Sequence, residues 1–307
     1  MHTYLDIPGH RIAWGARTYV MGILNVTPDS FSGDGLLSTI PNTSEPADGN
    51  RLDASPLERA VQQAERFIRE GADILDIGGE STRPGAEAVS AAEELERVVP
   101  LVRELAAAQD VLISIDTYKA EVAEAALEAG AHIVNDVWGL RADPQLAEVA
   151  ASRGVPVILM HNRSSWAHAE IKERLGGRYV NMPYENLLED VKRELLESVG
   201  IAKVAGVQDE QIILDPGIGF GKTVEQNLEL IDRLGEIREL GYPVLLGPSR
   251  KSFIGYTLTL PPDQRLAGTA AAVALGIVRG ADIVRVHDVE FMARVARMTD
   301  AMVRRAA

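Results

Sequence analysis

The sequence GADILD at residues 71–76 recurs in altered form as GAHIVN at 130–135 and as GADIVR at 280–285. In each copy, a glycine suited to ending a helix is followed by a short run of branched apolar residues typical of a strand. Two related junctions, GVPV at 154–157 and GYPV at 241–244, share this order of glycine and apolar residues. The repeat therefore predicts a chain of alternating helices and strands.

Eight short apolar runs are predicted as strands, and most of them are too apolar to have a solvated face, as in a parallel sheet covered by helices. They lie at residues 19–24, 73–77, 111–115, 132–136, 156–160, 211–215, 243–247 and 282–286. No glycine-rich dinucleotide fingerprint follows the first run. The pattern therefore favours an α/β protein with a (β/α)8 TIM barrel over an open doubly wound sheet.

We expect residues 1–307 to form one domain. Residues 36–53 are rich in Ser, Pro, Asn and Asp, which is typical of an insertion, here in the first βα loop. A second long loop is expected at 161–183. Helix starts are predicted from capping boxes in SPLE at 55–58, in SAAE at 90–93 and in TVEQ at 223–226.

The composition limits the classes of partner. The formal net charge is -14 and the pI is about 4.9, which argues against a nucleic-acid surface because such a surface needs a basic face. The chain has no cysteine, so disulfides and thiolate metal sites are excluded. The N-terminal segment lacks an apolar signal region, and the apolar run 266–278 is shorter than the roughly 18 residues of a membrane span. We expect a cytoplasmic protein that binds small molecules and no membrane.

Polar side chains stand where the predicted strands end, and in a barrel these ends form the active-site face. By the repeat, Asp76, Asn135 and Arg285 occupy equivalent strand ends. Burying charge in a barrel is costly unless the charge is paired. Their placement at strand ends therefore favours a functional site over a role in core packing. For Asp76 alone, pairing with a neighbouring arginine explains the residue equally well.

The types of side chain indicate a ligand. Two carboxylates, an amide and an ammonium match a flat heterocycle whose edge alternates donors and acceptors; they belong to Asp116, Asp215, Asn135 and Lys251. A second group can surround a phosphorylated leaving group and comprises Asn25, Thr82, Arg285 and His287. The Asn25 oxygen could ligate a hard cation such as Mg²⁺. The alternative for Asn25 is an Asx turn ahead of Thr27 and Pro28, and the alternative for His287 is a supporting position behind the site or a helix cap.

The segment GPSRKSFIG at 247–255 follows the seventh predicted strand with Ser, Arg and Lys. We expect the Ser249 hydroxyl to cap the next helical turn, whose N-terminus would bind an anion. By contrast, GIGFGKT at 217–223 only looks like a phosphate loop, because Pro216 stands where that motif needs its first glycine.

Seven motifs together resemble the dihydropteroate synthase family. They are NVTPDSFSGDG (25–35), DIGGESTRPGA (76–86), SIDT (114–117), IVND (133–136), DPGIGFGKT (215–223), GPSRKSFIG (247–255) and RVHDV (285–289). The resemblance implies a homodimeric barrel enzyme. Such an enzyme joins 6-hydroxymethyl-7,8-dihydropterin diphosphate to p-aminobenzoate and releases 7,8-dihydropteroate and diphosphate.

The resemblance also implies roles for individual residues. The pterin would be held by Asp116, Asn135, Asp215 and Lys251 and flanked by Phe220 and Arg285. The diphosphate and Mg²⁺ would be surrounded by Asn25, Arg83, Arg285 and His287, with Asn25 on the metal. The p-aminobenzoate would meet Phe31, Thr82, Pro84 and Ser252, with its carboxylate at the helix N-terminus behind Ser252. The catalytic residues would be Asp116, Asp215, Lys251 and Arg285, in a dissociative substitution that Asp215 stabilises.

Two departures from the family pattern are present. Asn162 stands where the family usually has methionine, and the 36–53 insertion is longer than usual. Two alternatives remain open at this stage. A methyltetrahydrofolate-dependent methyltransferase uses a similar barrel but binds no diphosphate, and a pterin-binding paralogue could have lost catalysis.

Overall fold

A computed structural model describes residues 3–26, 55–81, 88–172 and 174–304. Its main sheet has eight parallel strands in the order β10-β7-β6-β5-β4-β3-β12-β11. A parallel bridge between Leu214 and Val244 joins the two outer strands and closes the sheet into a barrel. The strands are β3 (Tyr19–Asn25), β4 (Ile74–Gly78), β5 (Leu112–Asp116), β6 (Ile133–Asp136), β7 (Val157–Met160), β10 (Ile212–Asp215), β11 (Leu245–Leu246) and β12 (Ile283–Val286).

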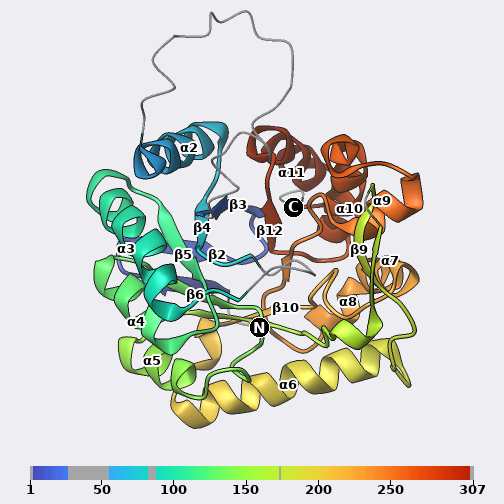
Figure 1. Cartoon of the computed structure of the whole chain (residues 1–307), viewed down its shortest axis with the longest axis horizontal. Coiled ribbons are helices and arrows are strands. Elements are labelled where there is room, and N and C mark those ends of the chain that lie inside the picture. Colours follow the sequence, from blue (N-terminus) through green and yellow to red (C-terminus); the bar gives the residue numbers. More distant parts are fainter. Residues whose placement is uncertain (1–2, 27–54, 82–87, 173, 305–307) are drawn as a thin grey trace, which may run out of the picture.

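Helices surround the barrel and cover the apolar outer faces of its strands (Figure 1). They are α2 (Pro56–Glu70), α3 (Ala91–Ala108), α4 (Ala120–Ala129), α5 (Gln145–Arg153), α6 (Leu187–Ala205), α7 (Val224–Asp232), α8 (Leu234–Arg238), α9 (Ser252–Leu258), α10 (Leu266–Val278) and α11 (Val289–Val303). Short 3-10 turns lie at Trp166–His168, Asp209–Gln211 and Pro262–Gln264. Among the described residues, no helix combines the length and apolar character that crossing a bilayer requires.

The predicted TIM barrel is confirmed, and each of the eight predicted strands is present. Gly71 and Gly130 end their helices in the left-handed conformation, with φ of 102° and 113°, as the repeat predicts. Several strands begin one residue later than predicted. Asp73, for example, lies just before β4, where its carboxylate accepts a hydrogen bond from the Val20 N–H and its own N–H donates to the Val20 carbonyl. The strand predicted at 243–247 shortens to two residues, since Pro243 has no N–H to donate.

The predicted helix starts are largely confirmed. Ser55 and Thr223 form complete capping boxes. Only half of the capping box predicted at 90–93 is present. The Ser90 hydroxyl accepts from the Glu93 N–H, but the Glu93 carboxylate pairs with Arg97. That glutamate gains a charge-assisted partner one turn further along the helix, so it does not reach back to the cap.

A hairpin that the sequence analysis did not predict lies before the barrel. Its strands are β1 (Tyr4–Ile7) and β2 (His10–Ala13), paired antiparallel. The side chains of Leu5, Ile12 and Trp14 join the first residues of the barrel strands in one buried apolar cluster. The hairpin therefore fills the N-terminal end of the barrel, opposite the strand ends that carry the polar residues.

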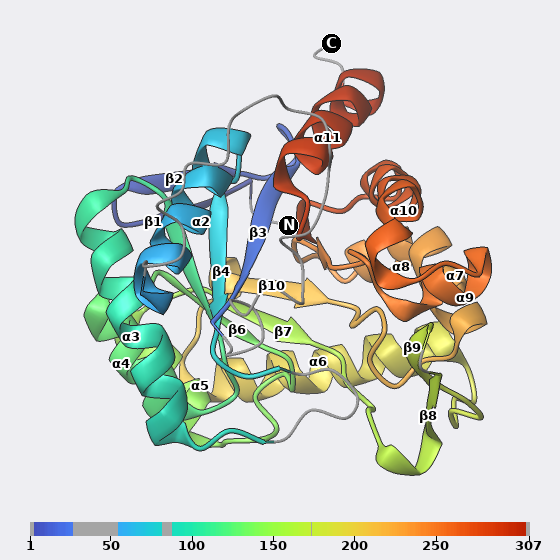
Figure 2. The ribbon, with the colours of Figure 1, turned by 45° about the horizontal axis from the view of Figure 1, so that its top comes forward.

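The second long loop, expected at 161–183, is partly structured. It contains a hairpin of β8 (Ala169–Lys172) and β9 (Gly176–Tyr179), which projects beside α9 (Figure 2). Arg265 donates to the Leu175 carbonyl and the Tyr256 hydroxyl to the Gly176 carbonyl, at 2.9 and 3.1 Å. These contacts with the C-terminal part of the chain fix the hairpin, so a local sequence pattern could not reveal it.

Candidate active site

The three strand ends that the repeat makes equivalent meet at the C-terminal mouth of the barrel. The Arg285 guanidinium donates from Nε to Asp76 Oδ2 at 2.5 Å and from Nη2 to Asp116 Oδ2 at 2.6 Å. Asn135 Nδ2 donates to the same Asp76 oxygen at 3.1 Å. Asp76 is fully buried, so the pairing with a neighbouring arginine that we considered for it is present, and it organises two predicted site residues.

In this cluster, the single guanidinium of Arg285 pairs with two carboxylates, those of Asp76 and Asp116. Burial raises the pKa of Asp116 to about 7, against the attraction of Arg285 and with the repulsion of Asp76. Burial also opposes the charge of Arg285, yet Asp76 and Asp116 together raise the pKa of that guanidinium above its ordinary value. Arg285 therefore stays charged, and Asp116 is the carboxyl whose charge can change near neutral pH.

Lys251 lies in the segment after β11, the strand next to β12. Its ammonium donates to the Ile218 carbonyl and lies 4.6 Å from the centre of the Phe220 ring. Burial lowers the pKa of Lys251 to about 8, while Asp215 opposes that shift. For Asp215 the effects are reversed, because burial raises the pKa of this carboxyl and Lys251 opposes the rise. Each of these oppositely charged groups therefore partly offsets the cost of burying the other.

The cap predicted at Ser249 is wrong. The Ser249 hydroxyl accepts a hydrogen bond from the His287 N–H at 3.1 Å and lies 3.0 Å from His287 Nδ1, and α9 begins only at Ser252. The intervening Arg250 has a positive φ of 55° and pairs with Asp288. That turn directs the chain past β12. Ser249 therefore hydrogen-bonds to His287, at the end of β12, and does not cap α9.

The remaining predicted residues divide into two groups. Asn25 ends β3 at the same mouth and is partly exposed, and Ser252 is the first residue of α9. Phe31, Thr82, Arg83 and Pro84, together with the insertion at 36–53, lie outside the described residues. Asn162, which departs from the family pattern, is buried and donates to the Val137 carbonyl. Its amide therefore binds within the protein wall rather than projecting into the mouth.

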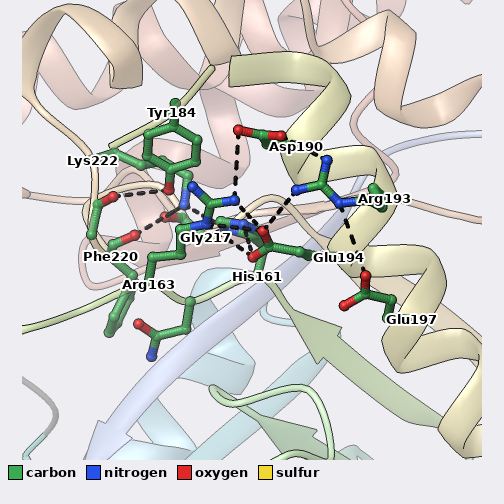
Figure 3. A network of polar contacts seen from close by, with 12 residues as sticks. His161, Arg163, Tyr184, Asp190, Arg193, Glu194, Glu197, Gly217, Phe220 and Lys222 are labelled. Atoms are coloured by element: carbon green, nitrogen blue, oxygen red, sulfur yellow. Dashed lines mark hydrogen bonds and ion pairs between the residues drawn. The ribbon is translucent and has the colours of Figure 1, made fainter. Parts of the chain in front are cut away.

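One buried network was missed by the sequence analysis. Lys222, in the segment dismissed as a phosphate loop, is only 2% exposed and contacts His161 (Figure 3). The only signal in the sequence is a lysine following three closely spaced glycines, which cannot reveal its partner 61 positions earlier.

The strand ends at the mouth thus carry both acids and cations. Asp116 and Asp215 can accept hydrogen bonds from ligand N–H groups, and Lys251 and Arg285 can donate to acceptors or to an anion. In the described part of the chain, no group of three or more His, Cys, Asp or Glu side chains is arranged to hold a metal ion. The amide oxygen of Asn25, at the end of β3, is a hard ligand of the kind that Mg²⁺ accepts together with substrate oxygens and water.

Comparison with known proteins gives consistent results. Residues 21–287 match the family model described as "Pterin binding enzyme". A dihydropteroate synthase of Clostridium beijerinckii is 51% identical over 292 residues, which cover 95% of this chain and 96% of that relative.

Two solved structures share the whole architecture. A Xanthomonas albilineans dihydropteroate synthase with 4-aminobenzoic acid has a TM-score of 0.83 at 39% identity and covers 98% of both chains. A structure of the same enzyme with 7,8-dihydropteroate has a TM-score of 0.80 at 37% identity, covering 97% of this chain and 98% of that one.

Proposed function

This chain belongs to the dihydropteroate synthases among the pterin-binding enzymes, and from that premise we propose how its barrel mouth works. It condenses 6-hydroxymethyl-7,8-dihydropterin diphosphate with p-aminobenzoate to give 7,8-dihydropteroate and diphosphate. One observation carries the assignment of the site: two acids, Asp116 and Asp215, and two cations, Lys251 and Arg285, lie buried or half-buried at the strand ends. Relatives that bind 4-aminobenzoic acid and 7,8-dihydropteroate support these substrates.

The pterin ring occupies the space between the two charged pairs in this proposal. Asp116 and Asp215 accept from its N–H groups, and Asn135 and Lys251 serve its acceptors. Phe220 supplies a flat apolar wall, since its ring already lies against the Lys251 ammonium. Arg285 faces the other side of the ring, held in place by Asp76.

The chemistry that we propose is a dissociative substitution. The bond between the pterin methylene carbon and the diphosphate oxygen breaks, and its electron pair leaves with diphosphate. Arg285 and His287 stabilise the departing charge, as does Arg83 by its family role, while the ionised Asp215 stabilises the carbocation. The amine nitrogen of p-aminobenzoate then bonds to that carbon and loses one proton, so no covalent bond to the enzyme is needed.

We assign p-aminobenzoate to the side of the pocket near Ser252, following the family roles of Phe31, Thr82 and Pro84. Mg²⁺ is the proposed metal, bound by Asn25 together with substrate oxygens, and when bound it neutralises charge on the leaving diphosphate.

The direct test supplies purified protein with pterin diphosphate, p-aminobenzoate and Mg²⁺, and measures dihydropteroate by chromatography. We expect synthesis with Mg²⁺ and none with excess EDTA. We also expect EDTA to leave the melting temperature of the substrate-free protein unchanged, because the metal is bound largely through substrate. Full activity in EDTA would refute the metal assignment. Pterin binding without synthesis would identify an inactive paralogue.

The charges of the site predict a bell-shaped pH profile of kcat/KM for the pterin substrate. Asp116, with a pKa of about 7, loses its value as an acceptor as it takes up a proton at lower pH. Lys251, with a pKa of about 8, loses its ammonium at higher pH. Activity should therefore fall on both sides of a narrow maximum between these two values. The Lys251→Arg variant is the control, since it should remove the alkaline limb while leaving the acid limb.

We also propose a cytoplasmic homodimer. Exposed apolar side chains on the neighbouring helices α10 and α11 support a second copy as the partner. Phe291, Met298 and Met302 share one face of α11, and Val278 is exposed at the end of α10. Sedimentation equilibrium should give twice the mass of the chain.

A further inference from the structure

The turn formed by residues 217–221 builds one wall of the proposed pterin pocket. It carries the Phe220 ring and the Ile218 carbonyl, both of which contact Lys251. The turn lies so close to the segment after β7 that a Cβ on Gly217 would stand 1.8 Å from the His161 oxygen. A Cβ on Gly221 would likewise stand 2.3 Å from the carbonyl carbon of Arg163. The position of the 217–221 turn is therefore set by its packing against the segment after β7.

Lys222 is the side chain immediately behind this turn. Its ammonium has three partners at hydrogen-bonding distance: the Gly217 carbonyl at 2.9 Å, the Phe220 carbonyl at 3.0 Å and His161 Nδ1 at 2.9 Å. An ammonium has three protons and no acceptor. Every proton of an ammonium at Lys222 thus has a partner. Two of these partners are carbonyls of the turn, so the buried Nζ atom holds Gly217 and Phe220 together.

His161 can accept from Lys222 in only one tautomer. Its Nε2 lies 3.1 Å from the Glu194 carboxylate, which is an acceptor when ionised, so Nε2 carries the proton and Nδ1 is free to accept. Burial and the Lys222 charge lower the pKa of His161 to about 3. The imidazole therefore stays neutral. Burial lowers the pKa of Lys222 well below its ordinary value, and Asp215 opposes that shift. The geometry around Nζ, two carbonyl oxygens and one imidazole nitrogen free to accept, matches the three protons of an ammonium.

Glu194 is held in turn by groups of the surrounding elements. Arg163 Nε donates to its carboxylate at 2.9 Å, and the Arg163 guanidinium lies 4.3 Å from the Tyr184 ring. The Tyr184 hydroxyl donates to the Gly221 carbonyl at 2.9 Å, which returns the network to the turn (Figure 3). The network thus joins the segment after β7, helix α6 and the turn after β10.

We propose that Lys222 is a positioning residue for the pterin site, and that His161 is the acceptor that keeps its ammonium in place. Through the two carbonyls that it binds, Lys222 fixes the Phe220 ring and the Ile218 carbonyl, and these in turn fix Lys251. Its charge also lies behind Asp215 and supports that carboxylate. The inference rests on the proposed function, because it assigns Lys222 to the pterin side of that site.

The first test replaces Lys222 with methionine, which keeps a similar stem but removes the ammonium. We expect kcat/KM for the pterin substrate to fall by about 10²-fold, the loss that a small misplacement of a site can cause. The dissociation constant of 6-hydroxymethylpterin should rise in parallel, measured by calorimetry on protein shown to be folded by circular dichroism. Lys203→Met is the matched control, because Lys203 pairs with Asp209 at the surface, and it should behave as the parent protein.

The second test does not depend on the folding of the first variant. His161→Asn places an amide oxygen near the position of Nδ1, so it can still accept from Lys222, but it loses the contact with Glu194. His161→Gln reaches the position of Nε2 and keeps the Glu194 contact, but it leaves Lys222 without its acceptor. We expect His161→Asn to retain pterin binding and His161→Gln to lose it, as Lys222→Met does.

The outcomes separate this inference from the function on which it rests. If the parent protein makes no dihydropteroate, the proposed function fails. If the parent is active and Lys222→Met lowers only the melting temperature, with kinetic constants and pterin affinity unchanged, Lys222 is a packing residue and the inference is overturned. Equal pterin affinity in the two His161 variants, or loss in His161→Asn alone, would also overturn it.

Discussion

Replacing Arg285 with methionine is expected to abolish dihydropteroate synthesis and to destabilise the protein by about 3–5 kcal/mol, the cost of leaving a buried charge without its partner. Asp76 is fully buried, and Arg285 is its only cationic partner among the described residues. The same substitution removes the group that we propose to stabilise the departing diphosphate. Equilibrium urea unfolding gives the stability, and the synthase assay gives the activity.

A double variant separates the two effects. Asp76→Asn combined with Arg285→Met removes the buried charge together with its partner, and Asn135 can still hydrogen-bond to an amide at position 76. Asp116 retains the attraction of Lys251. We expect the double variant to regain most of the lost stability while remaining inactive. Unaltered stability of the single Arg285→Met variant would contradict the role of the Asp76 pair.

Replacing Lys251 with alanine is expected to lower turnover by about 10²-fold or more, the scale of losing one preorganised donor in an active site. The ammonium faces Asp215 and the Phe220 ring, so its loss removes a ligand donor and leaves the wall without its contact at Ile218. The fold should remain intact, because Asp215 still accepts from the Gly217 N–H at 2.7 Å and can take up a proton. Steady-state kinetics with circular dichroism measure both.

The matched control for this variant is Lys192→Ala, since Lys192 pairs with Glu189 one helical turn away on α6, outside the site. It should retain normal turnover. Normal turnover in Lys251→Ala as well would remove Lys251 from the active site.

The repeat carries most of what the sequence predicts. A glycine that ends a helix and a branched run that follows it mark each strand locally, so the barrel and the strand ends follow from neighbouring residues alone. Because equivalent strand ends meet at one face, the repeat by itself predicts that Asp76, Asn135 and Arg285 lie close together. Their contacts in the structure agree with this expectation. Their roles toward substrate remain predictions.

The features that were not predicted depend on distant partners. The β8–β9 hairpin is fixed by Arg265 and Tyr256, which lie 90 and 80 positions from the carbonyls that they contact. Ser249 looks like a helix cap from its neighbours, but His287 is its partner in space. Lys222 is an unremarkable lysine in the sequence, and its burial follows from the His161 segment behind it. No local pattern encodes such pairings.

The closure of the barrel has a consequence for how the chain folds during synthesis. The first barrel strand, β3, pairs with the last, β12, so that Tyr19 lies opposite Ile283, and Thr18 donates to Asp300 of α11. These contacts cannot form until residues 283–300 have left the ribosome. Until then β3 presents an unpaired edge, which invites association with other chains, and the long loop that must close slows the final step. The nascent chain should therefore depend on chaperones for longer than its modest size suggests.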